Sequence, residues 1–105
     1  AELIAYDDLT KARMAHAAGI QVIVTSALDT GIGIAAALHV AAALPQPAPP
    51  CGLATLELLA DGLIQPELPI ESGTMRVPSG PGLGVAIDEQ ALARHAAGEE
   101  RIVRA

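Results

Sequence analysis

The chain has 105 residues, which is enough for one domain with a modest hydrophobic core. Its formal net charge is −6, only six residues are Lys or Arg, and Tyr6 is the one aromatic residue. This composition argues against nucleic-acid binding, because a phosphate backbone would be repelled and no aromatic surface could stack on bases.

Helix and strand signals alternate from the start of the chain. Residues 9–18 are predicted to form a helix that Asp7 or Asp8 caps and Gly19 ends. The run IQVIVT, residues 20–25, is rich in β-branched side chains and predicts a strand that is buried on both faces.

The alternation continues through the middle of the chain. Residues 32–44 predict an Ala-rich helix, which Pro45 and the prolines after it stop. Residues 51–53 predict a very short strand, followed by helical turns over 56–61 with Thr55 as their cap.

The last third has a different composition. Prolines and glycines between residues 66 and 84 predict turns and short extended pieces, and Asp88 is placed to cap a last helix that Gly98 ends. The βα alternation before this region favours an α/β fold with a parallel sheet. Because two strands cannot form a covered parallel sheet alone, the chain is predicted to be a piece of something larger.

A polar cluster lies between the first predicted strand and the helix that follows it. Ser26, Asp29 and Thr30 come directly after the strand's carboxyl end, where α/β sheets and barrels bind ligands. Hydroxyls, backbone N–H groups and a helix N-terminus at this place suit an anionic ligand such as a carboxylate. Asp29 or Thr30 could equally cap the helix, and the two interpretations are compatible.

The glycines of the same segment resemble a dinucleotide-binding loop. Gly31, Gly33 and Ala36 fit the pattern G-x-G-x-x-G/A, which would make the protein an NAD-dependent oxidoreductase. However, five residues separate Gly31 from the strand. The acidic ribose partner should end a second strand about twenty residues on, where this chain has its Pro-rich segment. A tight loop and close helix packing are the favoured explanation.

Other reactive side chains give no catalytic or metal-binding pattern. The three histidines, His16, His39 and His95, lie on separate predicted helices without ligand spacing. Cys51 has no base near it in sequence and is expected to be a small buried residue, and Lys11 is expected at the solvated surface. A lone cysteine and the lack of a signal segment or long apolar run predict a cytoplasmic protein with no membrane span.

Three stretches resemble the enolase superfamily in its muconate-lactonising subgroup. VTSALDTGIGIAAALHVAAALP is similar to the seventh strand and helix of that family's barrel, and PPCGLATLELLADGLI to its eighth strand and short helix. GTMRVPSGPGLGVAIDEQAL is similar to its C-terminal stretch. Within the subgroup, the likeness is greatest to the o-succinylbenzoate synthases.

The resemblance implies a (β/α)7β barrel with a separate α+β capping domain. Residues 1–65 would be the C-terminal piece of the barrel, with strands seven and eight and their helices. Residues 66–105 would be the C-terminal segment of the capping domain. The implied chemistry is abstraction of a proton next to a carboxylate, with Mg²⁺ holding the enediolate and a lysine as base. In the synthases, loss of water then gives o-succinylbenzoate for menaquinone synthesis.

The resemblance places a substrate-binding set in this chain but no catalytic or metal-binding residue. The family's base lysines and metal carboxylates lie on earlier strands, so the remainder of the barrel and capping domain is the expected partner. The alternatives are an N-acylamino-acid racemase, a dipeptide epimerase, a muconate cycloisomerase, or a non-catalytic fragment stabilised by association, including with a second copy of itself. The implied substrate-binding residues are Ser26, Asp29, Thr30, Gly52 and Leu53.

Overall fold

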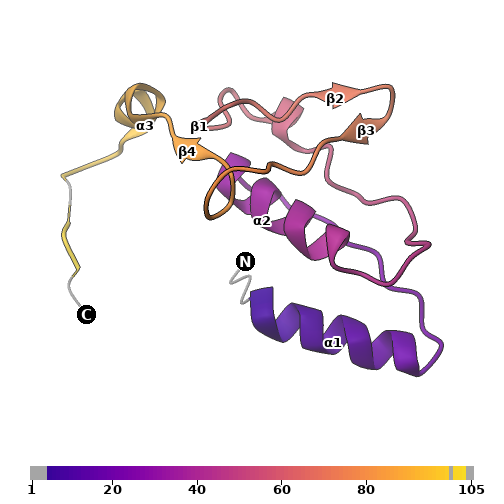
Figure 1. Cartoon of the computed structure of the whole chain (residues 1–105). Helices are drawn as coiled ribbons and strands as arrows, with labels where there is room; N and C mark the ends of the chain where they lie inside the picture. Colours follow the sequence, from indigo (N-terminus) through magenta and orange to yellow (C-terminus); the bar gives the residue numbers. More distant parts are fainter. Residues whose placement is uncertain (1–4, 100, 104–105) are drawn as a thin grey trace.

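A computed structural model describes the backbone of residues 5–99 and 101–103, and the side chains from residue 9 onward over the same range. Helices α1 and α2 lie side by side, and short strands pass over α2 on its other side (Figure 1). In chain order, the elements of the described part are α1 (Ala5–Ala17), α2 (Gly31–Ala42), the 3-10 helix η1 (Leu56–Leu58), β1 (Ile64–Gln65), β2 (Ile70–Glu71), β3 (Thr74–Met75), β4 (Ala86–Ile87) and α3 (Glu89–His95).

Helix α1 ends as predicted but begins earlier than predicted. Gly19 has φ of 73°, its N–H donates to His16 at 3.0 Å, and the N–H of Ile20 donates to Ala15 at 2.9 Å. These two bonds form a Schellman motif, so the expectation for Gly19 is confirmed. Asp7 and Asp8 lie inside the helix, so the prediction that one of them caps it is wrong. Ala5 and Tyr6 contain no helix breaker, and the helix runs back through them.

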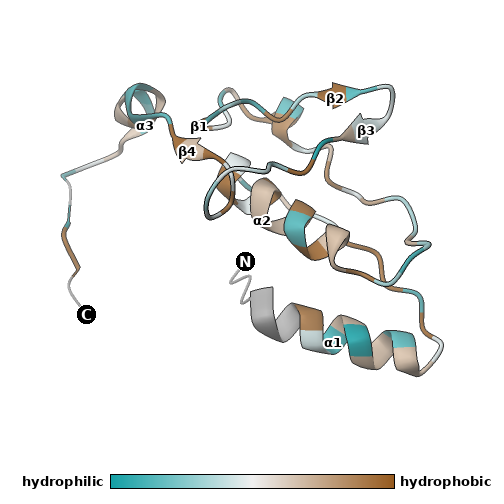
Figure 2. Ribbon diagram, viewed as in Figure 1, coloured by the Kyte–Doolittle hydropathy of each residue, from teal (hydrophilic) through white to brown (hydrophobic). Residues whose placement is uncertain are grey.

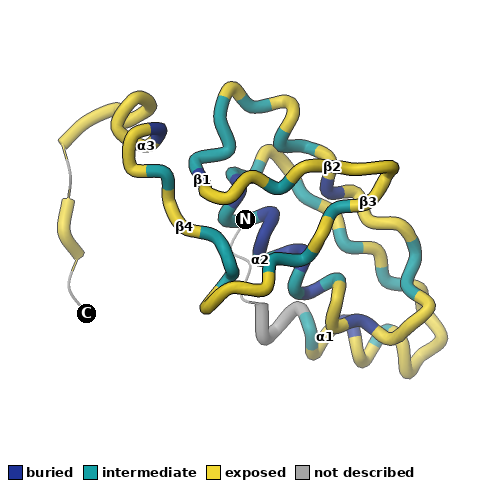
Figure 3. Tube along the Cα trace, turned by 45° about the horizontal axis from the view of Figure 1, so that its top comes forward, coloured by how far each residue is buried: buried dark blue, intermediate teal, exposed yellow. Residues whose placement is uncertain are grey.

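Helix α2 forms the centre of the core. It carries mostly hydrophobic residues (Figure 2), and nearly all of its length is buried or half-buried (Figure 3). Small alanines let neighbouring segments approach it closely, and Ile34 is completely buried. The main buried cluster comprises Ile34, Ala37, Leu38 and Leu53.

The segment 20–25 runs extended but is neither a full strand nor buried. It makes a single parallel bridge, from Thr25 to Gly52. The predicted parallel neighbourhood of the two segments is therefore confirmed. The predicted burial is wrong, because Ile20 is 60% and Ile23 is 54% exposed. No other segment of the described chain pairs with its second edge.

The C-terminal third consists of short pieces. β1 pairs antiparallel with β4, and β2 forms a tight hairpin with β3, in which Gly73 has φ of 75°. The turns and extended pieces predicted over 66–84 are confirmed. The helical turns predicted over 56–61 reduce to η1, which is only three residues long.

Helix α3 lies at one end of the body, beyond β4, and is exposed except at Ala91 (Figure 3). Its predicted cap, Asp88, is confirmed, because one carboxylate oxygen accepts from the N–H groups of Gln90 and Ala91, each at 3.0 Å. The helix ends at His95 and not at Gly98, since Ala96 already has an extended backbone. No helix in the described ranges is long and apolar enough to cross a membrane.

Candidate functional site

The predicted site residues gather where two parallel segments end. The N–H of Gly52 donates to the carbonyl of Val24 at 2.8 Å, and the N–H of Ser26 donates to the carbonyl of Gly52 at 3.0 Å. These bonds place the carboxyl ends of residues 20–25 and 51–53 next to each other. The loop that begins at Ser26 therefore stands beside Gly52, as the βα pattern predicted.

Ser26 links its own loop to Gly52 and to Thr55. Its hydroxyl Oγ donates to the carbonyl of Gly52 at 3.3 Å and lies 2.8 Å from Oγ1 of Thr55. Thr55 precedes η1 but makes no side-chain capping hydrogen bond. The predicted N-cap position of Thr55 is therefore confirmed, but its side chain does not make the hydrogen bond expected of a cap.

Asp29 and Thr30 are the two residues that the sequence offered as caps of α2. Thr30 occupies the N-cap position of α2 with an extended backbone, but its side chain makes no capping bond. Asp29 instead closes its own loop, where its carboxylate accepts from the N–H of Ala27 at 3.1 Å. Both residues are half-buried. Neither side chain caps α2.

Gly52 and Leu53 lie on opposite sides of their segment. Gly52 is exposed, and a Cβ there would lie 3.1 Å from Cγ2 of Thr25. Leu53 is 4% exposed and packs in the cluster of Ile34 and Leu38. Alternate residues of an extended chain face opposite ways, so the Leu53 side chain is turned into the core. Ser26 and Gly52 lie together, whereas the Leu53 side chain is part of the core. Contact of these residues with a substrate stays a prediction.

The glycines of α2 have a packing reason. A Cβ at Gly31 would lie 2.3 Å from Cγ1 of Ile64 and 2.9 Å from the carbonyl oxygen of Gly62. The Gly31 N–H donates to that same carbonyl at 2.8 Å. At Gly33, a Cβ would lie 2.9 Å from Cβ of Asp29. Close approach to neighbouring segments accounts for both glycines without a nucleotide.

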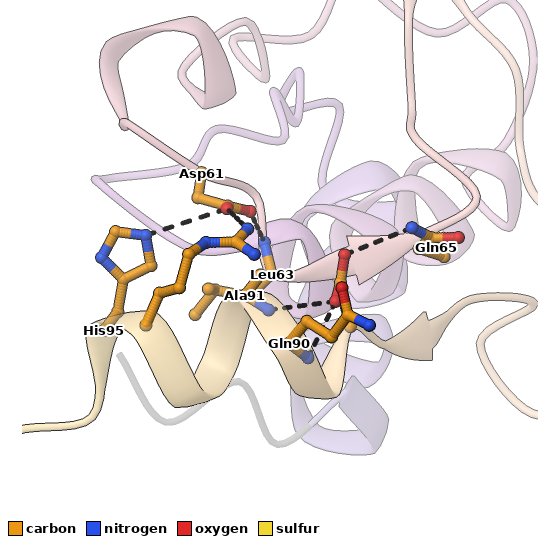
Figure 4. Close-up of polar contacts among 8 residues, drawn as sticks. Asp61, Leu63, Gln65, Gln90, Ala91 and His95 are labelled. Carbon is orange, nitrogen blue, oxygen red and sulfur yellow. Dashed lines mark hydrogen bonds and ion pairs between the residues drawn. The ribbon is translucent and has the colours of Figure 1, made fainter.

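A second polar cluster holds α3 to the segment before β1, and the sequence did not reveal it (Figure 4). Asp61 accepts from the Leu63 N–H and from Nη2 of Arg94, each at 2.9 Å, and Nε2 of His95 lies 3.8 Å away. These groups, first the Leu63 N–H and then Arg94, lower the pKa of Asp61.

Asp88 lies in the same region and also has a lowered pKa, because the Ala91 N–H and then the Gln65 side chain donate to its carboxylate (Figure 4). The capping role of Asp88 was readable from its position before a helix. The pairing of Asp61 with Arg94 was not, since 33 residues separate them and no local pattern links them.

The remaining reactive residues do not converge. His39 places Nε2 3.1 Å from the carbonyl oxygen of Leu83, while His16 lies at the far end of α1. Cys51 is exposed, so the expectation that it is buried is wrong. It directly precedes Gly52, the bridged residue of the second parallel segment. Among the residues that the structure describes, no three His, Cys, Asp or Glu side chains are grouped to hold a metal ion.

Comparison with known proteins gives a consistent family assignment. The family model described as "Enolase C-terminal domain-like" matches residues 9–91. A chloromuconate cycloisomerase of Pseudomonas putida is 48% identical over 87 residues, which are 83% of this chain and 23% of that protein. An o-succinylbenzoate synthase of Thermobifida fusca is 49% identical over 59 residues, which are 55% of this chain and 19% of that protein.

A solved structure shares the fold of most of the chain. The muconate lactonizing enzyme of Klebsiella pneumoniae superposes with a TM-score of 0.75 and 32% sequence identity, covering 83% of this chain and 24% of that one. The chain thus spans about a quarter or less of the length of these relatives.

Proposed function

Because the chain belongs to the enolase C-terminal domain-like family, we propose that it supplies one wall of the active site of an o-succinylbenzoate synthase-like lyase. Such a lyase removes a proton next to a carboxylate and then eliminates water. The proposed contribution of this chain is the wall formed by the loop 26–30 and Gly52. The remainder of the barrel and capping domain is its proposed partner, and the menaquinone pathway in the cytoplasm its proposed setting.

One observation carries this proposal: the parallel bridge between Thr25 and Gly52, with polar groups at its carboxyl end and one edge left open. Gly52 bonds to Val24 and Ser26, so in an extended chain the N–H and C=O groups of Ile23 and Thr25 point to the opposite edge. Unpaired edges of this kind accept another strand. A further parallel strand placed there would continue the sheet and pair with these backbone groups.

The division of labour follows from the side chains that are present. The described residues do not fit a Mg²⁺ site, because no three of their acidic, His or Cys side chains are grouped. We therefore assign this chain no step that involves the metal. Its own groups shape the wall: Gly52 leaves room at the end of its segment, and the half-buried Asp29 and Thr30 stand at the entrance to α2.

A second candidate is a cycloisomerase of the same subgroup. The chloromuconate cycloisomerase of P. putida matches 83% of the chain, whereas the synthase of T. fusca matches 55% at similar identity. The synthase reaction begins by forming negative charge next to a carboxylate, and the cycloisomerase reaction passes through the same kind of charge. The same wall could therefore serve either reaction. The substrate that the complete protein converts distinguishes the two candidates.

The test uses the complete protein, meaning the product of the full reading frame that contains this chain, supplied with Mg²⁺. We expect formation of o-succinylbenzoate from its hydroxycyclohexadiene precursor, and none in EDTA. Lactone formation from muconate without synthase activity would favour the second candidate. Failure of both reactions, or a reading frame without the lysine pair K-x-K before Ala1, would contradict the proposal.

A further inference from the structure

The strongest unassigned feature is the hydroxyl pair of Ser26 and Thr55. The two side chains are 29 residues apart in sequence and place their oxygens 2.8 Å from each other, in a partly buried position. Only one bridge aligns the two parallel segments at this end. The pair therefore adds a side-chain link at the point where the backbone hydrogen bonds between the two segments end.

Each hydroxyl has one proton to donate and two lone pairs to accept with. The Ser26 proton has two acceptors within reach, the carbonyl oxygen of Gly52 at 3.3 Å and Oγ1 of Thr55 at 2.8 Å. Either hydroxyl can donate across the shorter contact, so in both arrangements Ser26 is bonded to Thr55 beside the backbone of Gly52.

These contacts bear on the role of Ser26. A hydroxyl whose one proton is donated to the Gly52 carbonyl or to Thr55 has none left for a carboxylate. Resting on the proposed function, we propose that Thr55 and Ser26 are positioning residues, which hold the loop 26–30 against Gly52 without contacting the substrate themselves. Thr55 acts through Ser26, so the two belong to one unit.

Such a unit predicts a specific pattern in a double-mutant cycle. In the complete protein, Thr55→Val and Ser26→Ala should each lower kcat/KM by about 3- to 10-fold, the range expected for one neutral hydrogen bond. The double variant should be little worse than either single variant. Thr55→Ser, which keeps the hydroxyl group, should restore most of the activity. Thr74→Val, at the exposed residue of β3, is the matched control and should have no effect.

Hydrogen exchange gives a readout that does not depend on the reaction. The amides of Ser26 and Gly52 should exchange about 3- to 10-fold faster in Thr55→Val than in wild type or Thr55→Ser. If the wild-type protein catalyses neither reaction but this exchange pattern holds, the proposed function fails and the structural link stands.

Two outcomes would overturn the proposal. A much larger loss in Ser26→Ala than in Thr55→Val, with additive effects in the double variant, would make Ser26 a direct substrate contact. Unchanged kinetics and unchanged amide exchange in Thr55→Val would leave Thr55 without a positioning role.

Discussion

The part of the chain around α2 and the segment 20–25 differ in how completely their apolar side chains are buried. Around α2, the side chains of Ile34 and Ala37 are 0% and 1% exposed, and neighbouring segments approach closely enough to require Gly31. Along residues 20–25, Ile23 is 54% exposed although most of the segment is apolar. The difference shows where the chain is self-sufficient and where another segment is expected to complete it.

The largest expected effect tests the part around α2. Ile34→Ala should lower the free energy of unfolding of the complete protein by about 2–5 kcal/mol, because a completely buried side chain is lost and a cavity remains. Urea unfolding measures this change. Ile102→Ala is the matched control, since Ile102 is 75% exposed. Equal effects of the two substitutions would show that α2 is not the core.

A smaller loss is expected from Gly31→Ala. The added Cβ would lie 2.9 Å from the Gly62 carbonyl oxygen, a backbone atom that cannot move cheaply, so we expect about 1–3 kcal/mol of destabilisation. Gly98→Ala is the control, because nothing lies within 4 Å of a Cβ there. If thermal unfolding of both variants matches the wild type, the close packing of α2 on β1 is wrong.

Beside the segment 20–25, Gly52→Ala should change function more than stability. The new methyl group would lie 3.1 Å from Cγ2 of Thr25, so a shift of a few tenths of an ångström relieves it. A displaced site wall should lower kcat/KM by about 10-fold. Wild-type turnover in this variant would contradict the placement of Gly52 in the wall.

The smallest expected effect concerns α3 and pH. The pKa of Asp61 is lowered in the folded chain, so its contribution is present above the unfolded value of about 4 and disappears as the pH falls through the lower folded value. Asp61→Asn should flatten this acid dependence of α3 protection in hydrogen exchange between about pH 5 and pH 2.5. Glu71→Gln on the exposed β2 is the control. An unaltered acid profile would show that Arg94 is held by something else.

Local signals in the sequence predicted local features, and contacts between distant residues escaped them. The glycine at position 19 and the cap at Asp88 depend only on neighbouring residues, and both were predicted correctly. The parallel neighbourhood of Thr25 and Gly52 was also expected, from the βα pattern.

Burial and side-chain partners could not be predicted in the same way. The contact of the Thr55 hydroxyl with Ser26 joins residues 29 positions apart, and no local pattern in the sequence indicates it. The apolar run 20–25 indicated burial, but the segment that would bury it is not among the described residues. The burial of the Leu53 side chain could not be predicted either, because the sequence does not show which way a residue of such a short extended piece faces.

We propose that a parallel strand pairs with the free edge of residues 20–25 in the complete protein. Amide hydrogen exchange resolved to single residues tests this pairing, with the bonded Ser26 amide as internal reference. We expect the Ile23 and Thr25 amides to be protected to a similar degree as Ser26, because the added strand accepts from them. Protection of Ser26 alone, with Ile23 and Thr25 exchanging as fast as an exposed loop, would contradict it.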